Sequence, residues 1–356
     1  MIEFENLKQL NKPFFKEYQE KFKEILESGW YILGKNVSLF ENNFSKFNSS
    51  KYTIGVASGL DALILSLKAC DFEKKSEIIV PSNTYIATWL AVSYTGAIPV
   101  PVEPLLDTYN IDVSRIETAI SSKTKAIMVA HTLGNPYDLD AIVALCKKHN
   151  LWLVEDNCDA LGSKYLGQYT GTFGDISTLS FYPAHHITMG EGGAVLTNDP
   201  LLNKIIMSYR DWGRDCWCPP GKDNTCNNRF GFQMGALPEG YDHKYIYSHI
   251  GYNLKITDWQ AACGLAQLDK LDEFVQARID NFDYLHNGLK DLEEYLILPY
   301  AVENANPSWF GFPITVKDNA PFNKLELTKY LEEKRIGTRQ VFAGNILRQP
   351  AYRTTN

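Results

Sequence analysis

The sequence lacks the features of a membrane-spanning, secreted or nucleic-acid-binding protein. No stretch comes near the ~20 consecutive apolar residues of a membrane-spanning helix. Its first residues, Met1–Glu5, lack the basic-then-apolar order of a signal peptide. A net charge of −7 leaves no excess of positive charge to hold a phosphate backbone. We therefore expect a cytoplasmic protein that binds neither membranes nor nucleic acids.

The chain also lacks an even set of cysteines for a disulfide framework, since it has seven. Three of them lie in apolar, helix-like stretches and are interpreted as small buried residues: Cys70, Cys146 and Cys263. The other four are candidates for metal or catalytic roles: Cys158, Cys216, Cys218 and Cys226.

Apolar strand-like runs alternate with helical patterns along most of the 356 residues. This alternation predicts an α/β fold with a parallel or mixed sheet covered on both faces. The expected strands are 50–57, 77–80, 98–102, 126–130, 151–156, 175–181, 194–197 and, later in the chain, 307–316. The expected helices include 11–28, 139–148, 258–274 and 325–334.

A change in pattern and the elements that follow it indicate the domain organisation. Between residues 208 and 249 periodicity is lost and Trp, Tyr, Gly, Pro and Cys are dense, which predicts a long ordered loop or an insertion. We expect a large domain over 1–268, which includes an N-terminal helix and this loop, and a small α+β domain over 269–356.

Polar residues follow several of the expected strands, where ligands bind in such sheets. They are Ser58-Gly59, Tyr85, His131, Asp156 and His185. Ser58-Gly59 before a helix is typical of a phosphate cradle, but on this stretch alone a plain strand-to-helix connection is favoured. Tyr85 fits either stacking on a flat ring or core packing. Asp156 fits a pyridinium N–H, an ion pair or a helix cap.

Four motifs resemble the vitamin B6-dependent sugar aminotransferases. They are Glu155-Asp156-Asn157-Cys158-Asp159-Ala160-Leu161-Gly162, Ser180-Phe181-Tyr182-Pro183, Gly190-Glu191-Gly192-Gly193-Ala194-Val195 and Gly251-Tyr252-Asn253-Leu254-Lys255. The resemblance runs from about Phe4 to the end of the chain. It implies the fold-type I aminotransferase architecture, with a mostly parallel sheet in the large domain and a smaller C-terminal α+β domain. It also implies a homodimer that acts on nucleotide-linked keto sugars.

The resemblance also implies roles for individual residues. The cofactor phosphate would bind at Gly59, Leu60 and Ser180. Tyr85 would stack on the cofactor ring, and Asp156 would pair with its nitrogen. Asp159 would lie near the ring hydroxyl, and Asn253 would reach the cofactor phosphate of the partner subunit.

The chain departs from the aminotransferases at His185. In that family, the second residue after the proline of Ser-Phe-Tyr-Pro is the lysine that holds the cofactor as a Schiff base. An imidazole cannot form this bond, which needs a primary amine, but it can move protons near neutral pH. We therefore expect a cofactor held without a covalent bond, as pyridoxamine 5′-phosphate (PMP) rather than PLP, and a catalytic His185. His186 fits a supporting role or a structural one equally well.

The four remaining cysteines have the spacing C-x57-C-x-C-x7-C. Four thiolates suit zinc or an iron–sulfur cluster, although a set of unpaired cysteines without a site is the simpler interpretation of the residues alone. Together with His185, the spacing resembles the PMP-dependent, [2Fe–2S]-containing 3-dehydrases of CDP-4-keto-6-deoxyglucose. This resemblance implies that Cys158, Cys216, Cys218 and Cys226 hold a [2Fe–2S] cluster.

The resemblance thus implies the removal of the C3 hydroxyl from a nucleotide-linked 4-keto-6-deoxyhexose, with a CDP-linked substrate expected. Electrons would come from a separate NAD(P)H-dependent flavin or iron–sulfur reductase, and the product would serve 3,6-dideoxysugar and lipopolysaccharide O-antigen biosynthesis. Three alternatives stay open: a PLP-dependent transaminase, a cluster-free 3-dehydratase of the colitose type, and a non-catalytic, metal-stabilised sugar-binding protein. We also expect the small domain to be incomplete at its C-terminus.

Overall fold

The structure is a computed structural model that describes residues 2–3 and 6–353. Phe4, where the resemblance begins, and Thr354–Asn356, where the chain stops, lie outside the described residues. The same holds for Met1 and Glu5 of the N-terminal segment in which a signal peptide was sought.

A seven-stranded sheet forms the centre of the fold, in the order β1-β9-β8-β5-β4-β2-β3. Its strands are β1 (Tyr52–Val56), β2 (Glu77–Pro81), β3 (Ile98–Val102), β4 (Thr124–Ala130), β5 (Trp152–Asp156), β8 (Ile176–Ser180) and β9 (Gly193–Thr197). β9 pairs antiparallel with both β1 and β8, whereas the other neighbours pair parallel. The mixed sheet expected from the sequence is confirmed, and six of its seven strands run in one direction.

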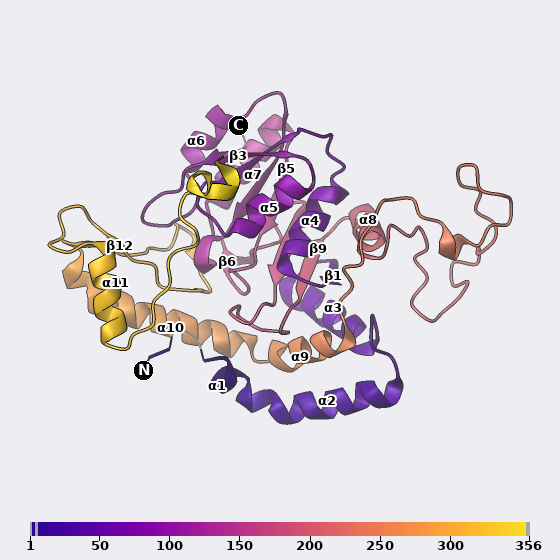
Figure 1. Ribbon diagram of the computed structural model, residues 1–356, viewed down its shortest axis with the longest axis horizontal. Coiled ribbons are helices and arrows are strands. Elements are labelled where there is room, and N and C mark those ends of the chain that lie inside the picture. The colour runs from indigo at the N-terminus through magenta and orange to yellow at the C-terminus, as the bar shows by residue number, and fades with distance from the viewer. Residues whose placement is uncertain (1, 4–5, 354–356) are drawn as a thin grey trace.

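Helices cover both faces of this sheet (Figure 1). α4 (Gly59–Ala69) and α5 (Ile86–Tyr94) pack on one face, where Ile78 and Val80 of β2 point. α6 (Val113–Ala119) and α7 (Leu139–His149) pack on the opposite face, toward which the Ile79 side chain of β2 points. The alternation of neighbouring residues between two apolar clusters explains why these strands are apolar throughout.

The remaining helices of the first 270 residues complete the cover. They are α1 (Leu7–Asn11), α2 (Phe15–Ser28), α3 (Lys35–Asn48), α8 (Pro200–Arg210) and α9 (Asp258–Leu268), with short 3-10 turns at Lys12–Phe14, Thr132–Gly134 and His243–Tyr245. α8 and α9 begin at side-chain caps, because Asp199 accepts from the N–H groups of Leu201 and Leu202 and Thr257 forms a capping box with Gln260. No helix in the described residues is long and apolar enough to cross a membrane.

The last third of the chain differs from the sequence-based expectation in two elements. The predicted helix 258–274 is two helices, because α9 ends at Leu268 and α10 (Leu271–Leu289) begins three residues later. The predicted strand 307–316 is wrong except for β12 (Thr315–Val316), which pairs with β10 (Leu296–Ile297). Trp309 instead stacks on Phe282 of α10, with ring centroids 3.7 Å apart. The apolar residues of this run therefore pack against a helix and do not pair in a β-sheet.

A separate three-stranded sheet, in the order β11-β6-β7, joins this last region to the segment that follows β5. β11 (Ala305–Asn306) pairs with β6 (Lys164–Tyr165), which also pairs with β7 (Gln168–Tyr169). The chain continues through α11 (Lys324–Glu333) and 3-10 turns at Lys290–Leu292, Ile346–Arg348 and Pro350–Tyr352. Figure 1 shows α10 running beneath the sheet, with α11 and β12 at one end of the molecule.

The segment 211–250 projects from the opposite end (Figure 1). Apart from the turn His243–Tyr245 it has no helix or strand. Residues 208–210 of the loop predicted over 208–249 belong to α8, and the assignment of the rest to the large domain stays a prediction.

Candidate active site

The C-terminal ends of the parallel strands bring most of the predicted site residues to one edge of the sheet. Gly59 follows β1, Tyr85 follows β2, Asp156 ends β5 and Ser180 ends β8. Because these strands run in the same direction, residues far apart in the sequence lie at the same edge.

The start of α4 forms a tight junction with the end of β8. The Ser58 side chain caps the helix by accepting from the N–H of Asp61. A Cβ atom on Gly59 would lie 2.7 Å from Ser180 Cβ and 3.0 Å from its Oγ, so only glycine fits. Leu60 packs into the cluster under α5. The predicted phosphate residues Gly59, Leu60 and Ser180 are thus brought together at a helix N-terminus, where backbone N–H groups favour an anion.

Asp156 is buried at the end of β5, with 6% of its surface exposed. Its Oδ2 accepts a hydrogen bond from the Thr88 hydroxyl at 3.0 Å, and its Oδ1 accepts from the Cys158 N–H at 3.3 Å. Thr88 lies on α5, three residues after Tyr85 at the helix N-cap. The Tyr85 ring is 62% exposed, so it is not a core residue of this chain and can stack on a ligand.

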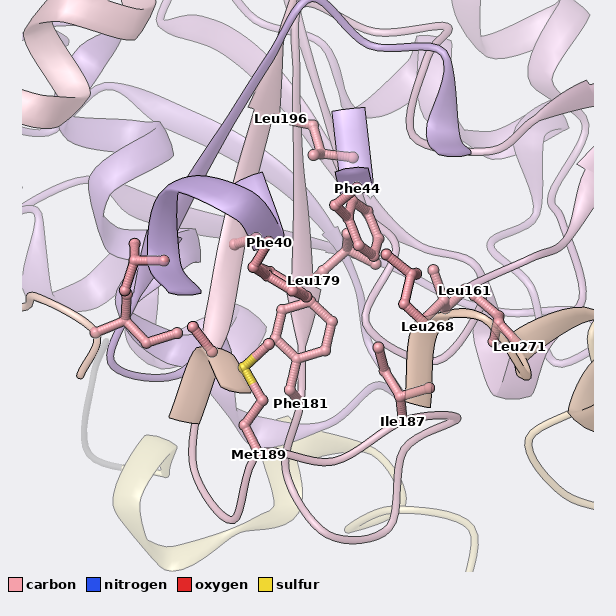
Figure 2. Packing of buried hydrophobic residues seen from close by; sticks show 14 residues of the cluster. Phe40, Phe44, Leu161, Leu179, Phe181, Ile187, Met189, Leu196, Leu268 and Leu271 are labelled. Atoms are coloured by element: carbon pink, nitrogen blue, oxygen red, sulfur yellow. The ribbon is translucent and has the colours of Figure 1, made fainter. Parts of the chain in front are cut away.

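The loop between β8 and β9 is held by apolar residues on both sides of the histidine pair. Phe181, Ile187 and Met189 insert into one buried cluster with Phe40 and Phe44 of α3 (Figure 2). Phe181 packs edge-on against Phe40, with ring centroids 5.3 Å apart. This anchoring fixes the loop, and the histidines between the anchors are held at the sheet edge.

His185 faces Asp159, with 3.6 Å between Nδ1 and Oδ1. Burial, with the positive charge of Arg278 second, lowers the pKa of His185 to about 4. Burial, with the charge of Asp156 second, raises the pKa of Asp159 to about 7. Although the distance would permit an ion pair, these shifts favour the neutral form of both groups. Near pH 7 the imidazole is therefore neutral, and the carboxyl group beside it keeps its proton at a higher pH than an ordinary aspartate does.

His186 differs from His185 in having a fixed partner. Its Nε2–H donates to the Ser308 carbonyl at 2.9 Å, and its ring is 4% exposed. Burial lowers the pKa of His186 well below the usual value. The side chain therefore connects the loop to the segment after β11.

His131 does not join these residues through its side chain. It is fully buried, and its Nε2 lies 3.1 Å from Glu155 Oε2. Glu155 also accepts the N–H groups of Gly171, Phe173 and Gly174. This network closes the turn before β8, which is a structural role.

Asn253 lies close to the end of β1 but faces solvent. The Ala57 N–H donates to the Leu254 carbonyl at 3.0 Å, which places the segment beside Ser58. The Asn253 side chain is exposed and accepts from Lys255 Nζ at 2.6 Å. Its predicted contact with a partner subunit stays a prediction.

The four cysteines predicted to hold a cluster fall into two groups. Cys158 lies under the start of α4, since a Cβ on Gly59 would be 3.4 Å from its Sγ. Burial, followed by the charge of Asp156, raises the pKa of its thiol well above the usual value. Such surroundings disfavour the thiolate that metals require.

The other three cysteines lie in the projecting segment 211–250 (Figure 1). Cys216, Cys218 and Cys226 interact with one another, and Cys226 Sγ is 3.9 Å from His243 Nδ1. A hydrogen bond from Thr225 lowers the pKa of Cys218 to about 7. Within the described part of the chain, however, no group of three or more His, Cys, Asp or Glu side chains is arranged to hold a metal ion. The structure does not assemble the predicted four-cysteine set.

Sequence reasoning missed several residues that contact the site. Thr88 has a usable signal, because its spacing of three from Tyr85 puts both on one side of an expected helix. Leu133, Arg278, Ser308 and Phe310 have none, because their contacts with Asp159 and the histidine pair join separate elements that no local sequence pattern relates.

Comparisons with known proteins agree with the motifs. The model of the DegT/DnrJ/EryC1/StrS aminotransferase family matches residues 14–356. The lipopolysaccharide biosynthesis protein RfbH of Salmonella typhimurium is 53% identical over 91% of this chain and 76% of its own length. The dTDP-4-dehydro-2,6-dideoxy-D-glucose 3-dehydratase of Saccharopolyspora spinosa is 49% identical over 90% of this chain and 71% of its own length.

A solved structure extends the similarity to the fold. The E. coli GDP-4-keto-6-deoxy-D-mannose-3-dehydratase with bound hydrated PLP is 28% identical, and the match covers 94% of this chain and 85% of that one with a TM-score of 0.83. The predicted fold-type I architecture is therefore confirmed.

Proposed function

The chain belongs to the DegT/DnrJ/EryC1/StrS aminotransferase family, and from that premise we propose that it removes the C3 hydroxyl of a nucleotide-linked 4-keto-6-deoxyhexose with the help of PMP. The observation that carries the proposal is His185, a partly buried imidazole where the aminotransferases are expected to have lysine. The names of the two relatives above, one a 3-dehydratase and one a lipopolysaccharide biosynthesis protein, support it. A CDP-linked substrate, a homodimer and a cytoplasmic location stay predictions, as does the division into domains at 268/269.

The residues present fit PMP. The start of α4, where Gly59 leaves no room for a side chain beside Ser180, suits a phosphate group. Asp156 is a buried acceptor of the kind that pairs with a pyridinium nitrogen, and the exposed Tyr85 ring is available for stacking. Bound PMP would supply a primary amine and an electron sink.

In this mechanism His185 acts as the general base. Its low pKa keeps one ring nitrogen unprotonated near neutral pH. That nitrogen could therefore accept a proton from the C4′ carbon of bound PMP as the C3 hydroxyl of the sugar leaves. Asp159 lies beside the ring, with its Oδ1 3.6 Å from Nδ1. The apolar anchors Phe181, Ile187 and Met189 hold the imidazole in place and restrict water around it.

The experiment for this proposal follows proton exchange at C4′ of PMP. We expect the protein with PMP to exchange this proton in the presence of the keto sugar. Release of a 3-deoxy product takes two electrons, which would come either from a separate reductase or from the conversion of one PMP to PLP per sugar. In addition, His185→Lys should produce the absorbance of a Schiff base with PLP, because lysine restores the primary amine. Glutamate-dependent amination of the sugar by the unaltered protein would contradict the proposal and favour the transaminase.

The [2Fe–2S] cluster does not fit the side chains as arranged, and no step is derived through it. Cys158 lies beside Asp156, whereas Cys216, Cys218 and Cys226 lie in the projecting segment. This separation favours a second candidate, a cluster-free 3-dehydratase. Iron and sulfide analysis of anaerobically purified protein separates the two, since a [2Fe–2S] enzyme holds about two irons per chain. Of these two, only the [2Fe–2S] enzyme requires a separate reductase.

A further inference from the structure

The segment Pro307–Phe312, between β11 and β12, crosses the sheet edge beside the histidine pair. Residues 307–309 are buried and Phe310 is half-buried, although the segment forms neither helix nor strand. It is the run that the sequence predicts to be a strand, so its backbone groups need other partners.

Those partners come from both sides of the site. The Ser308 N–H donates to Ser163 Oγ at 2.8 Å, and the Ser308 carbonyl accepts from His186 Nε2 at 2.9 Å. The Phe310 N–H donates to the Leu133 carbonyl at 2.8 Å. Arg278 of α10 donates to the carbonyls of Trp309 and Phe310. The backbone of this segment is therefore held by hydrogen bonds from Ser308 to Phe310.

The approach is too close for any side chain on the facing turn. Gly134 has a φ of +88°, and a Cβ there would lie 2.1 Å from the Ser308 carbonyl oxygen. A glycine is therefore required by the contact as well as by the backbone angle.

The Phe310 ring consequently lies against the catalytic imidazole. Its centroid is 5.3 Å from that of His185, at an interplanar angle of 41°. The distance to the His186 ring is 6.3 Å. Of the two histidines, His186 holds the backbone and His185 receives the aromatic cover.

From this geometry we propose that Phe310 is a positioning residue, which covers the His185 ring and keeps it dry while His186 and Leu133 hold the segment in place. The inference rests on the proposed role of His185 as base. A ring within van der Waals reach removes water from one side of the imidazole, and desolvation disfavours its charged form.

The charged and titratable groups around His185 either lower its pKa further or have little effect on it. Arg278 from α10 adds a positive charge that lowers the pKa of His185. Asp159 faces Nδ1 but is itself raised to a pKa of about 7, so below that pH it offers little negative charge. His186 has a pKa well below the usual value and stays neutral. Burial, to which Phe310 contributes, is the largest cause.

The test uses Phe310→Ala with Phe312→Ala as the matched control. Both remove a phenyl ring from the same segment, but Phe312 packs on Phe282, at 5.0 Å, and not on a histidine. The histidine Cε1–H resonances of the full chain are titrated by NMR with and without PMP, and His185→Gln identifies the His185 signal. We expect Phe310→Ala to raise the pKa of His185 towards 6.5 by at least about one pH unit more than Phe312→Ala does. A smaller difference overturns the proposal.

A second variant guards against loss of folding. Phe310→Leu keeps an apolar side chain over the imidazole, so it should raise the pKa of His185 by less than half as much as Phe310→Ala. If the two variants raise it equally, the cover is not what matters and the proposal fails. The acidic limb of the pH profile for C4′ exchange should move with the NMR value. If Phe310→Ala raises the pKa of His185 but the unaltered protein shows no C4′ exchange at any pH, the proposed function is rejected and the role of Phe310 stands. If exchange occurs but the pKa does not rise, only the role of Phe310 is rejected.

Discussion

The loop between β8 and β9 and the projecting segment 211–250 both carry residues that the sequence marks for chemistry, but they are held differently. The first has Phe181, Ile187 and Met189 in the core, each with at most 5% of its surface exposed. The second has large exposed rings, with Trp217 47% exposed and Phe230 57% exposed. Irregular backbone holds a catalytic geometry when apolar anchors flank it. In 211–250, where Ile246 is buried but the large rings are exposed, the cysteines that lie close in sequence do not by themselves make a metal site.

The largest effect should come from the base itself. His185→Gln removes the proton acceptor and should lower the rate of dehydration by about 10²- to 10⁴-fold. His249→Gln, in the projecting segment, removes a hydrogen bond to Ser208 and should change the rate by less than about threefold. Steady-state rates at pH 7.5 measure both. A comparable loss in the two variants would break the contrast between the regions.

Stability should separate the regions next. Phe181→Ala deletes a fully buried ring between Phe40 and Phe44 and should cost about 3–5 kcal/mol of unfolding free energy. Trp217→Ala removes a half-exposed ring and should cost no more than about 1 kcal/mol. Urea denaturation gives both values. Equal costs would mean that the projecting segment has a core of its own.

The raised pKa of Asp159 predicts a pH-dependent gain in stability for Asp159→Asn. The carboxyl group titrates at about 7 when folded and near 3.9 when unfolded, so its contribution is fully present below pH 3.9 and is lost as the pH rises through 7. The variant should therefore be more stable than the unaltered protein by on the order of 2–4 kcal/mol at pH 8, and by little at pH 4.

Asp112→Asn is the control, because its effect on stability should depend on pH in the opposite direction. A hydrogen bond from Ser114 lowers the pKa of Asp112, so its contribution is present above the unfolded pKa and is lost as the pH falls. Thermal unfolding from about pH 2 to pH 8 follows both variants, because Asp112 titrates below its unfolded pKa of about 3.9. If Asp159→Asn shows no gain at pH 8, the buried carboxyl is not neutralised as inferred.

The smallest effect concerns glycine. Gly59→Ala would place a methyl group 2.7 Å from Ser180 Cβ, so it should cost about 1–3 kcal/mol and weaken PMP binding. Gly288→Ala on α10 meets no atom within 4 Å and should instead stabilise by about 0.5–1 kcal/mol. Calorimetry and PMP titration measure the pair. Unchanged PMP binding in Gly59→Ala would remove the start of α4 from the site.

Much of the site follows from local sequence patterns. Apolar runs that end in Gly59, Tyr85, Asp156 or Ser180 predict strand ends, and parallel strands bring such ends to one edge. The absence of lysine two residues after Pro183 is likewise readable without coordinates. The strand predicted over 307–316 was wrong because an apolar run has the same pattern whether it pairs in a sheet or packs on a helix.

The sequence by itself therefore determined the α/β class, and it predicted the sheet edge of the candidate site and the proposed base, because these depend on periodicity and on residue type. Only the tertiary structure decided which histidine is covered by Phe310 and which is bonded to Ser308, and that Cys158 lies beside Asp156 while the other three cysteines lie in the projecting segment. The physical reason is that burial and its effect on pKa depend on groups from distant parts of the chain, and no local pattern encodes those contacts.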